Sequence, residues 1–331
     1  MNRDIKICTI GGGTGTYTVL MGLKKYKVDL SVIISMMDSG GSNRIIRDEF
    51  GLLPTSDLRQ AMVALASEKS NELLRKLFTY RYSQGIGISG MTFGNLFMAA
   101  LTEILGSQEK AIKETCDLLG VRGKIIPVTL ENTNLVARYD NGRQILGEHN
   151  IDEPNKDLNH HKIVEMSLFP PAKVNIEAIE AIREAKMIVL TPGDLYTSII
   201  PNLLVKGIKS ALKQKKGKLV YVLNLMTKYG QTIGFKASDF LRNVNKYLGG
   251  NMVDIILINN NNNISKNIIK RYQEEKAFMV IDDLGKKRDI EIIRKDLISE
   301  TAYEKSKGDR LIRSLIRHDP DKLAAALMNL K

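Results

Sequence analysis

The sequence contains no tryptophan, only two cysteines and eight prolines, and only 6% aromatic residues among its 331 positions. The two cysteines, Cys8 and Cys116, lack the spacing of a metal-binding motif, so we expect buried thiols in a reducing compartment. No apolar run approaches the length of a membrane helix, and no leader pattern precedes the first apolar segment. We therefore expect a cytoplasmic protein without a membrane span.

The balance of charge is basic, with a formal net charge of +12. Basic residues nevertheless alternate with acidic ones, as in residues 286–289, and no basic stripe is interleaved with aromatic residues. The sequence is 43% apolar and 26% charged, which suits a packed globular protein. We therefore expect no nucleic-acid partner.

Short apolar runs alternate with amphipathic stretches along most of the chain. This rhythm predicts an α/β fold, a doubly wound, mostly parallel, Rossmann-like sheet within a single domain over 1–331. The predicted strands are 5–10, 30–37, 187–190, 219–223 and 253–258. The predicted helices are 16–25, 57–66 with Ser56 as N-cap, 70–80, 96–105, 108–119, 175–184 and a last helix from Pro320.

The period changes between residues 121 and 172. Alternating patterns there predict strands at 124–130, 135–140, 143–148 and 162–168. Asn141-Gly142 is a strong signal for a hairpin, because both residues tolerate positive φ. We expect a β-rich insert within the domain over 121–172.

A glycine-rich turn follows the first predicted strand, in the order Gly11, Gly12, Gly13, Thr14, Gly15. Exposed backbone N–H groups beside a helix N-terminus suit a phosphate. The spacing matches neither the dinucleotide fingerprint nor a P-loop. The alternative is a tight turn with close packing of helix on strand.

Polar residues also follow the other predicted strands. Asp38 could take ribose hydroxyls or a magnesium ion, or it could cap its own turn, and Ser42 follows it closely. Arg47 and Arg59 are candidate phosphate clamps, although Arg59 could simply pair with Asp57. Further candidates are Asn95, as a cap or a ligand contact, and Tyr196, Thr197, Asn224 at other strand ends.

Several catalytic mechanisms have no support in the sequence. The four histidines lack metal-ligand spacing, and no Gly-x-Ser-x-Gly elbow is present. We therefore assign no catalytic residue. An NAD-binding protein is compatible with the first glycine turn and Asp38, but the glycine spacing differs and no hydride-transfer acid is visible.

Taken together, these strings resemble the YvcK/CofD family over nearly the whole chain. The segments that carry the resemblance are Ile10-Gly11-Gly12-Gly13-Thr14-Gly15, Asp38-Ser39-Gly40-Gly41-Ser42, Asp57-Leu58-Arg59 with Val63-Ala64-Leu65, Gly94-Asn95-Leu96, Val121-Arg122-Gly123-Lys124, Pro192-Gly193 with Leu195-Tyr196-Thr197-Ser198 and Pro201-Asn202-Leu203-Leu204-Val205, and Asn224-Leu225-Met226-Thr227. The last two look especially like the YvcK branch.

The resemblance implies a Rossmann-like core and two branches of function. The CofD branch moves a phospholactyl-type group from a nucleotide diphosphate donor to the deazaflavin Fo. The YvcK branch is associated with cell shape and gluconeogenic growth, and binds UDP-sugars. By position, Gly12, Gly13 and Thr14 would cradle the diphosphate and Asp38 would hold a metal or a substrate hydroxyl. The residues that would line the nucleotide and sugar are Asn95, Tyr196, Thr197 and Asn224.

The chain departs from the usual family strings at residues 43–46, at Met91 where relatives carry His, and at Asp194 where relatives carry Ser. A negative Asp194 near a phosphate is repulsive unless a cation bridges it. These departures favour a binding and regulatory protein over a transferase. We expect a UDP-sugar ligand, with Mg²⁺ accompanying the nucleotide, a homodimer, and a protein partner in envelope synthesis.

Overall fold

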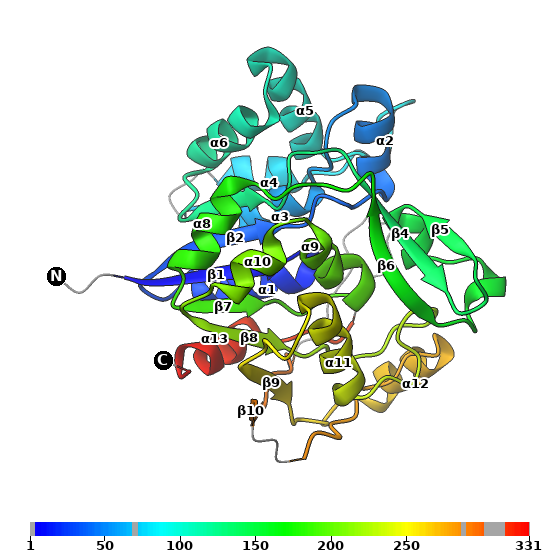
Figure 1. Cartoon of the computed structure of the whole chain (residues 1–331). Helices are drawn as coiled ribbons and strands as arrows, with labels where there is room; N and C mark the ends of the chain where they lie inside the picture. Colours follow the sequence, from blue (N-terminus) through cyan, green and yellow to red (C-terminus); the bar gives the residue numbers. More distant parts are fainter. Residues whose placement is uncertain (1–3, 68–71, 286–288, 301–314, 331) are drawn as a thin grey trace.

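The computed structural model describes residues 4–67, 72–285, 289–300 and 315–330. Its central element is a seven-stranded sheet in the order β10-β9-β8-β7-β1-β2-β3, and every neighbouring pair is parallel (Figure 1). The strands are β1 (Ile5–Gly11), β2 (Val28–Ile34), β3 (Lys124–Pro127), β7 (Met187–Leu190), β8 (Lys218–Val222), β9 (Ile255–Asn259) and β10 (Glu291–Lys295). The predicted doubly wound parallel fold is confirmed.

Continuous burial explains why these runs form a parallel sheet. All four residues of β7 are buried, and β1 and β2 are buried over most of their length. A strand covered by helices on both faces needs apolar side chains on both faces, so its sequence does not alternate. Strand order reverses at β1, with β2 on one side and β7 on the other, which makes the β1/β7 junction the switch point.

Helices cover both faces of the sheet (Figure 1). On one face α1 packs against α3 and α13; on the other face α10 packs against α8, α9 and α11. The helical elements of the core are α1 (Gly13–Leu23), α2 (Gly41–Phe50), α3 (Ser56–Leu65), α4 (Glu72–Thr79), α5 (Phe93–Leu105), α6 (Gln108–Leu119), α8 (Ile176–Glu184), η2 (Leu195–Ile199, a π-helical turn), α9 (Ile200–Leu204), α10 (Ile208–Lys213), α11 (Ala237–Leu248), α12 (Lys266–Glu274) and α13 (Pro320–Met328).

The β-rich insert is a three-stranded antiparallel sheet in the order β5-β4-β6. Its elements are β4 (Asn134–Tyr139), β5 (Gln144–Leu146), α7 (Glu148–Asp152), η1 (Lys156–Leu158) and β6 (Ile163–Phe169). The Asn141-Gly142 hairpin is confirmed, and Gly142 has φ of +82°. The strand predicted at 124–130 is not part of the insert: as β3 it forms the edge of the main sheet, because Ile125 and Ile126 are both buried there.

Each predicted helix is present with bounds within three residues of those expected, whereas α2, α11 and α12 were not predicted. One cap prediction is wrong. Ser56 is the first residue of α3 rather than its N-cap, and the N-cap position belongs to Thr55, whose side chain makes no capping bond. The Ser56 hydroxyl instead donates to Asn43. A hydroxyl that has a nearby side-chain acceptor is drawn away from the backbone of its own helix.

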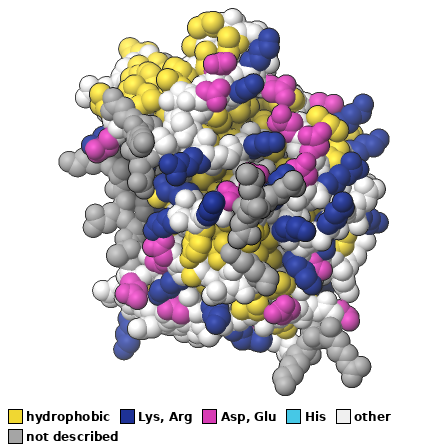
Figure 2. Space-filling model, turned by 90° about the vertical axis from the view of Figure 1, so that its left-hand side faces the viewer, with side chains coloured by type: hydrophobic (Ala, Val, Ile, Leu, Met, Phe, Trp, Pro, Cys, Tyr) yellow, Lys and Arg dark blue, Asp and Glu magenta, His cyan; other side chains and the backbone are white. Residues whose placement is uncertain are grey.

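The surface carries charges of both signs. Figure 2 shows Lys and Arg side chains spread over one face with Asp and Glu among them. Hydrophobic side chains gather at the top, the end where Figure 1 places α5 and α6. Exposed Ile104 of α5 and Leu118 of α6 belong to this end. Among the helices of the described residues, none has the length and apolar character needed to cross a membrane.

Candidate functional site

The glycine turn after β1 packs closely against the turn after β7. An ideal Cβ on Gly11 would lie 1.9 Å from Thr191 Oγ1, and one on Gly15 would lie 1.6 Å from the Pro192 carbonyl oxygen. Thr16 Oγ1 and Thr191 Oγ1 also hydrogen bond at 2.7 Å. Gly11 and Gly15 therefore serve close packing at the switch point, as the alternative from the sequence proposed.

Gly13 occupies a different environment. Its φ is +63°. A Cβ added to Gly13 would lie 3.9 Å from Ser198 Oγ, and no other side chain beyond its chain neighbours would come as close as 4 Å. Its backbone N–H donates to Asp57 Oδ2 at 2.8 Å. A carboxylate of the chain itself therefore lies at the positive end of α1, where a ligand's anion would be stabilised.

A second helical N-terminus lies at the same junction. The turn Pro192-Gly193-Asp194 leads into η2, whose first turn is followed directly by α9. The backbone N–H groups of Ser198 and Ile199 both donate to the Asp194 carbonyl oxygen, and the Asn224 side chain donates to the Gly193 carbonyl oxygen. The N-termini of α1, after β1, and of η2, after β7, thus both lie at the switch point. A π-helical turn such as η2 is frequent at functional sites.

Asp38 lies in the loop after β2 and is held by its own turn. Its Oδ1 accepts the Gly40 N–H at 2.8 Å and its Oδ2 accepts the Asn43 amide at 2.5 Å. Burial raises the pKa of Asp38, and the nearby charge of Asp152 raises it further, whereas these two donors lower it. The Asx-turn predicted as an alternative is present, and it fixes the direction of the carboxylate.

A chain of hydrogen bonds connects Asp38 with the interior of the helical layer. Asn43 Oδ1 accepts the Ser56 hydroxyl at 2.9 Å, and Ser56 Oγ accepts the Asn95 amide at 3.0 Å. Asn95 Oδ1 accepts Arg59 Nε at 3.2 Å, and Arg59 Nη1 donates to the Phe78 carbonyl oxygen at 3.4 Å. Asn95 is fully buried and Arg59 is 7% exposed. Asn95 and Arg59 therefore support the Asp38 loop from the buried side, through Ser56 and Asn43.

The insert contributes charged groups that the sequence did not reveal. Asp152 of α7 accepts hydrogen bonds from Thr197 Oγ1 at 3.0 Å and from Gln231 Nε2 at 3.2 Å. The Lys228 ammonium pairs with Asp152 and, at 2.7 Å, with Asp194 Oδ2. Burial lowers the pKa of Lys228, but the carboxylates of Asp194 and Asp152 outweigh it and raise this pKa above its usual value. Lys228 thus links Asp194 to Asp152 of the insert.

Glu148, also in α7, faces the Asp38 loop. Its Oε2 accepts the Ser39 N–H at 3.3 Å, next to the Asp38 turn. Burial raises the pKa of Glu148 well above its usual value, and the charges of Asp38 and Asp152 act in the same direction. Carboxyl groups with strongly perturbed pKa values in such a position are typical of functional sites.

The remaining predicted residues divide into three groups. Thr197 and Asn224 lie at the switch point, as described above; Thr14 lies in the first turn of α1 and its carbonyl oxygen accepts the Thr18 hydroxyl. Tyr196 is only 1% exposed, and its hydroxyl donates to Asn243 of α11, so its ring packs in the core. The side chain of Ser42 lies outside the described part of the structure.

Arg47, a candidate clamp, holds the insert instead. Its Nη2 donates to Asn132 Oδ1, the Thr133 carbonyl oxygen and Asn134 Oδ1, at 2.8–3.0 Å. The residues that the sequence missed are Asp57, Glu148, Asp152 and Lys228. Asp57 was visible as part of a motif; the other three are far apart in the chain and carry no local signal.

Metal binding by Asp38 would need oxygen atoms from elsewhere. Among the described residues, no group of three or more His, Cys, Asp or Glu side chains is arranged to hold a metal ion. Mg²⁺ is usually held by one or two carboxylates together with substrate phosphates and water. A magnesium ion at Asp38 would therefore have to take its other oxygen ligands from a nucleotide and water.

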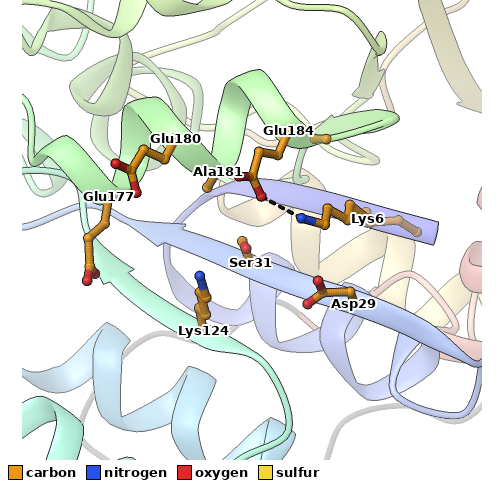
Figure 3. Close-up of a pocket in the computed structure, with 10 residues that line it drawn as sticks. Lys6, Asp29, Ser31, Lys124, Glu177, Glu180, Ala181 and Glu184 are labelled. Atoms are coloured by element: carbon orange, nitrogen blue, oxygen red, sulfur yellow. Dashed lines mark hydrogen bonds and ion pairs between the residues drawn. The ribbon is translucent and has the colours of Figure 1, made fainter. Parts of the chain in front are cut away.

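A small polar recess elsewhere has no relation to this site. It lies between α8 and the amino-terminal halves of β1, β2 and β3, and Figure 3 shows Lys6, Lys124 and three glutamates of α8 around it. Lys6 and Glu184 form an ion pair of 2.6 Å across it. Ligands of open α/β sheets bind at the opposite, carboxyl ends of the strands.

The comparisons with known proteins agree with one another. The family model described as 2-phospho-L-lactate transferase CofD matches residues 7–298. A "Putative gluconeogenesis factor" of Aquifex aeolicus is 39% identical over 335 residues, covering 99% of this chain and 97% of that protein. The "Gluconeogenesis factor" of Bacillus subtilis is 34% identical over 332 residues, covering 100% of this chain and 99% of that protein.

Solved structures show the same fold. The crystal structure of protein BH3568 from Bacillus halodurans superposes with a TM-score of 0.89 at 35% identity, covering 98% of this chain and all of that one. A second crystal structure of the Bacillus halodurans protein BH3568, described as a member of the UPF0052 family, superposes on this chain with a TM-score of 0.88. The two sequences are 34% identical, and the match covers 99% of this chain.

Proposed function

Because the chain belongs to the CofD family, with the gluconeogenesis factors of the YvcK type as its relatives, we propose that it is a regulatory protein that binds a UDP-sugar. The observation that carries the proposal is the meeting of two helix N-termini, of α1 and η2, at the switch point of a parallel sheet. This is the position at which open α/β sheets bind nucleotides. A Cβ added to Gly13 would meet only Ser198 Oγ, at 3.9 Å, so no other side chain of the protein covers this point of the turn.

The charges around the switch point favour a ligand that brings its own cation. Asp38, Asp57, Asp152 and Asp194 lie along this edge, and Lys228 is already paired with the last two. A diphosphate approaching these carboxylates is repelled unless a divalent cation lies between them. We therefore propose that Mg²⁺ accompanies the nucleotide and that Asp38 is its protein ligand.

The test is calorimetric titration with UDP-N-acetylglucosamine, UDP-glucose, UTP, NAD and GDP, each with and without Mg²⁺. We expect binding of the UDP-sugars in the presence of Mg²⁺ and no binding by Gly13→Asp, which places charge and bulk at the α1 N-terminus. Gly234→Asp is the matched control, since Gly234 also has positive φ, +71°, with open space around it. Retained affinity of Gly13→Asp would contradict this assignment of the site.

A second candidate function is a CofD-like transferase, favoured by the description of the matching family model. Such an enzyme needs a flat aromatic surface for its deazaflavin acceptor. Tyr196, the aromatic residue expected at the site, is buried and hydrogen bonded to Asn243. Binding of guanine nucleotide alone, together with turnover of Fo, would establish the transferase instead.

The cellular role can be tested by complementation. We propose a role in gluconeogenic growth and in the maintenance of cell shape, exerted through a protein partner in envelope synthesis and by a homodimer. In a bacterium lacking its own gluconeogenesis factor, the wild-type chain should restore growth on a gluconeogenic carbon source. Gly13→Asp should fail and Gly234→Asp should succeed; equal rescue by both would separate this role from ligand binding.

A further inference from the structure

The outer side of α4 carries apolar side chains in a single row. Leu73 and Leu77, with Tyr80 directly after the helix, follow the i, i+4, i+7 spacing that brings side chains to one side of a helix. These residues are 67%, 37% and 52% exposed, whereas Phe78 is fully buried. Phe78 therefore anchors α4 to the core, and the apolar row faces away from it.

A second apolar row lies on α5. Phe97, Leu101 and Ile104 have the same spacing; the first two are half-buried and Ile104 is 77% exposed. Glu103 is the only charged residue among the 13 of α5, although a surface helix usually has a charged outer side. The outer side of α5 thus has the composition of a covered surface.

The two rows are neighbours because α4 and α5 form an antiparallel hairpin. The Phe93 N–H donates to the Tyr80 carbonyl oxygen at 2.9 Å, and the rings of Phe78 and Phe97 lie 5.1 Å apart between centroids. Figure 2 shows hydrophobic side chains gathered at the end of the molecule that contains α5. Exposed apolar patches of this kind mark interaction sites. The residues of the two rows, here called the α4–α5 face, are Leu73, Leu77, Tyr80, Phe97, Leu101 and Ile104.

The charges around the α4–α5 face suit a second copy of the chain. The two helices together carry two acids, Glu72 and Glu103, and two bases, Arg75 and Lys76. The whole chain has a formal net charge of +12, so two copies repel each other when basic surfaces approach. A face that is apolar and balanced in charge is therefore where two copies can meet.

Glu72 and Lys76 also favour one orientation of the two copies. Both side chains are exposed, by 81% and 72%, although they pair with each other at 2.7 Å. A two-fold symmetric contact places the same surface of both copies together. When the two α4 helices run antiparallel, Glu72 of each copy lies toward the end of the other helix that carries Lys76, so acid meets base.

We propose that the α4–α5 face joins two copies of this chain in a symmetric dimer in which the two α4 helices are antiparallel. The proposal rests on the homodimer proposed above and adds the surface that forms it. Leu73, Leu77 and Ile104 supply the apolar contact, while Glu72 and Lys76 set the orientation.

The first test is sedimentation velocity of the full chain from low to high protein concentration. We expect the wild-type chain to pass from monomer to dimer as concentration rises. Leu73→Glu places a charge in the face and should weaken dimerisation about thirtyfold or more, the effect of losing a central interface side chain. Ile176→Glu is the matched control, since Ile176 is 63% exposed on α8, outside this face, and should dimerise as wild type does.

The outcomes separate this surface from the proposals above. A wild-type chain that is monomeric at every concentration would overturn the surface together with the homodimer. A dimer that Leu73→Glu leaves intact would overturn the surface alone. Neither result bears on UDP-sugar binding, which calorimetry measures on the same samples.

A second test uses charge to show that the partner is another copy. Glu72→Lys leaves only bases at positions 72 and 76, and Lys76→Glu leaves only acids, so each variant alone should dimerise more weakly than wild type. An equimolar mixture should form a heterodimer, because each lysine of one variant then meets a glutamate of the other. Circular dichroism checks that both variants are folded. Equal association of the two variants alone and mixed would refute the contact between the α4 helices.

Discussion

The Asp57 carboxylate accepts a hydrogen bond from the Gly13 backbone N–H, with 2.8 Å between Oδ2 and N. This contact brings the start of α3 against the start of α1, forty-four residues earlier in the chain. It places a negative charge of the protein at the position that a ligand's phosphate would prefer. The affinity of the site for anions is therefore set partly by Asp57.

Asp57→Asn should separate the structural part of this contact from its charge. The amide oxygen can still accept the Gly13 N–H, while the stabilising charge at the α1 N-terminus is lost, so unfolding should require about 0.3–1 kcal/mol less. UDP-sugar affinity without Mg²⁺ should rise, because the repulsion is gone. Urea unfolding and calorimetry measure the two effects.

Asp321→Asn is the control for Asp57→Asn, since Asp321 also lies in the first turn of a helix, α13, and pairs with Lys25. It should lower stability by a similar or smaller amount and leave affinity unchanged. Unaltered or weaker binding by Asp57→Asn would show that the ligand does not compete with this carboxylate.

Gly15→Ala should be far more damaging than Gly13→Ala. At position 15 the new Cβ would lie 1.6 Å from the Pro192 carbonyl oxygen, so α1 must move away from the turn after β7. At position 13 the cost is the positive φ, about 1–2 kcal/mol for a residue with a Cβ. Thermal unfolding should therefore show a large fall in Tm for Gly15→Ala and a modest fall for Gly13→Ala. Similar values for the two would contradict the close packing.

Much of the fold could be predicted because the signals are local. Continuous apolar runs such as Met187–Leu190 mark buried parallel strands, and Asn141-Gly142 marks a hairpin. Residues 124–130 were wrongly assigned to the insert because this run adjoins the insert in sequence. Only pairing with β2 shows that it belongs to the main sheet.

The candidate site could be predicted only in part. The strand ends at Gly13, Asp38 and Asn224 were visible, because parallel topology brings strand ends to one edge. Glu148 and Lys228 were not visible, since they meet the site only through the packing of the insert on the core. The ion pair between Lys228 and Asp194 also joins residues far apart in the sequence, so only tertiary structure shows it.

Lys228→Met should destabilise the junction between the insert and the core. The substitution leaves Asp152 and Asp194 without the ammonium group that they share. Since these groups are partly exposed, we expect the free energy of unfolding to fall by about 1–2 kcal/mol. Hydrogen-exchange protection of the α7 backbone should fall as well. In the Lys228→Met background, Asp194→Ser should recover part of the stability, because it removes one of the two repelling charges.

Lys322→Met provides a matched control for the lysine. The Lys322 side chain is 30% exposed, as is that of Lys228, and it pairs with Asp296 and Glu300. We expect a comparable or smaller loss of stability and no change in α7 protection. Normal α7 protection in Lys228→Met would show that the bridge does not hold the insert.

His318 should make stability depend on pH in the acidic range. It is buried, and desolvation lowers its pKa from 6.5 to about 4, although the backbone of Leu223 acts in the opposite direction. Because the unfolded chain binds this proton more readily, the stabilisation is complete above pH 6.5 and is lost as pH falls from 6.5 through 4. Between pH 7.5 and 5 the contribution should fall by about 2 kcal/mol.

Glu148 has the opposite effect on stability. Its raised pKa stabilises the folded state at low pH, and this stabilisation is lost as the pH rises through the pKa of the folded state. The two effects can be separated with His318→Gln, because the glutamine side chain is polar and cannot be protonated. The difference in unfolding free energy between wild type and His318→Gln should shrink on acidification, whereas exposed His160→Gln should match wild type at every pH. A difference that is constant from pH 7.5 to 5 would mean that folding does not lower the pKa of His318.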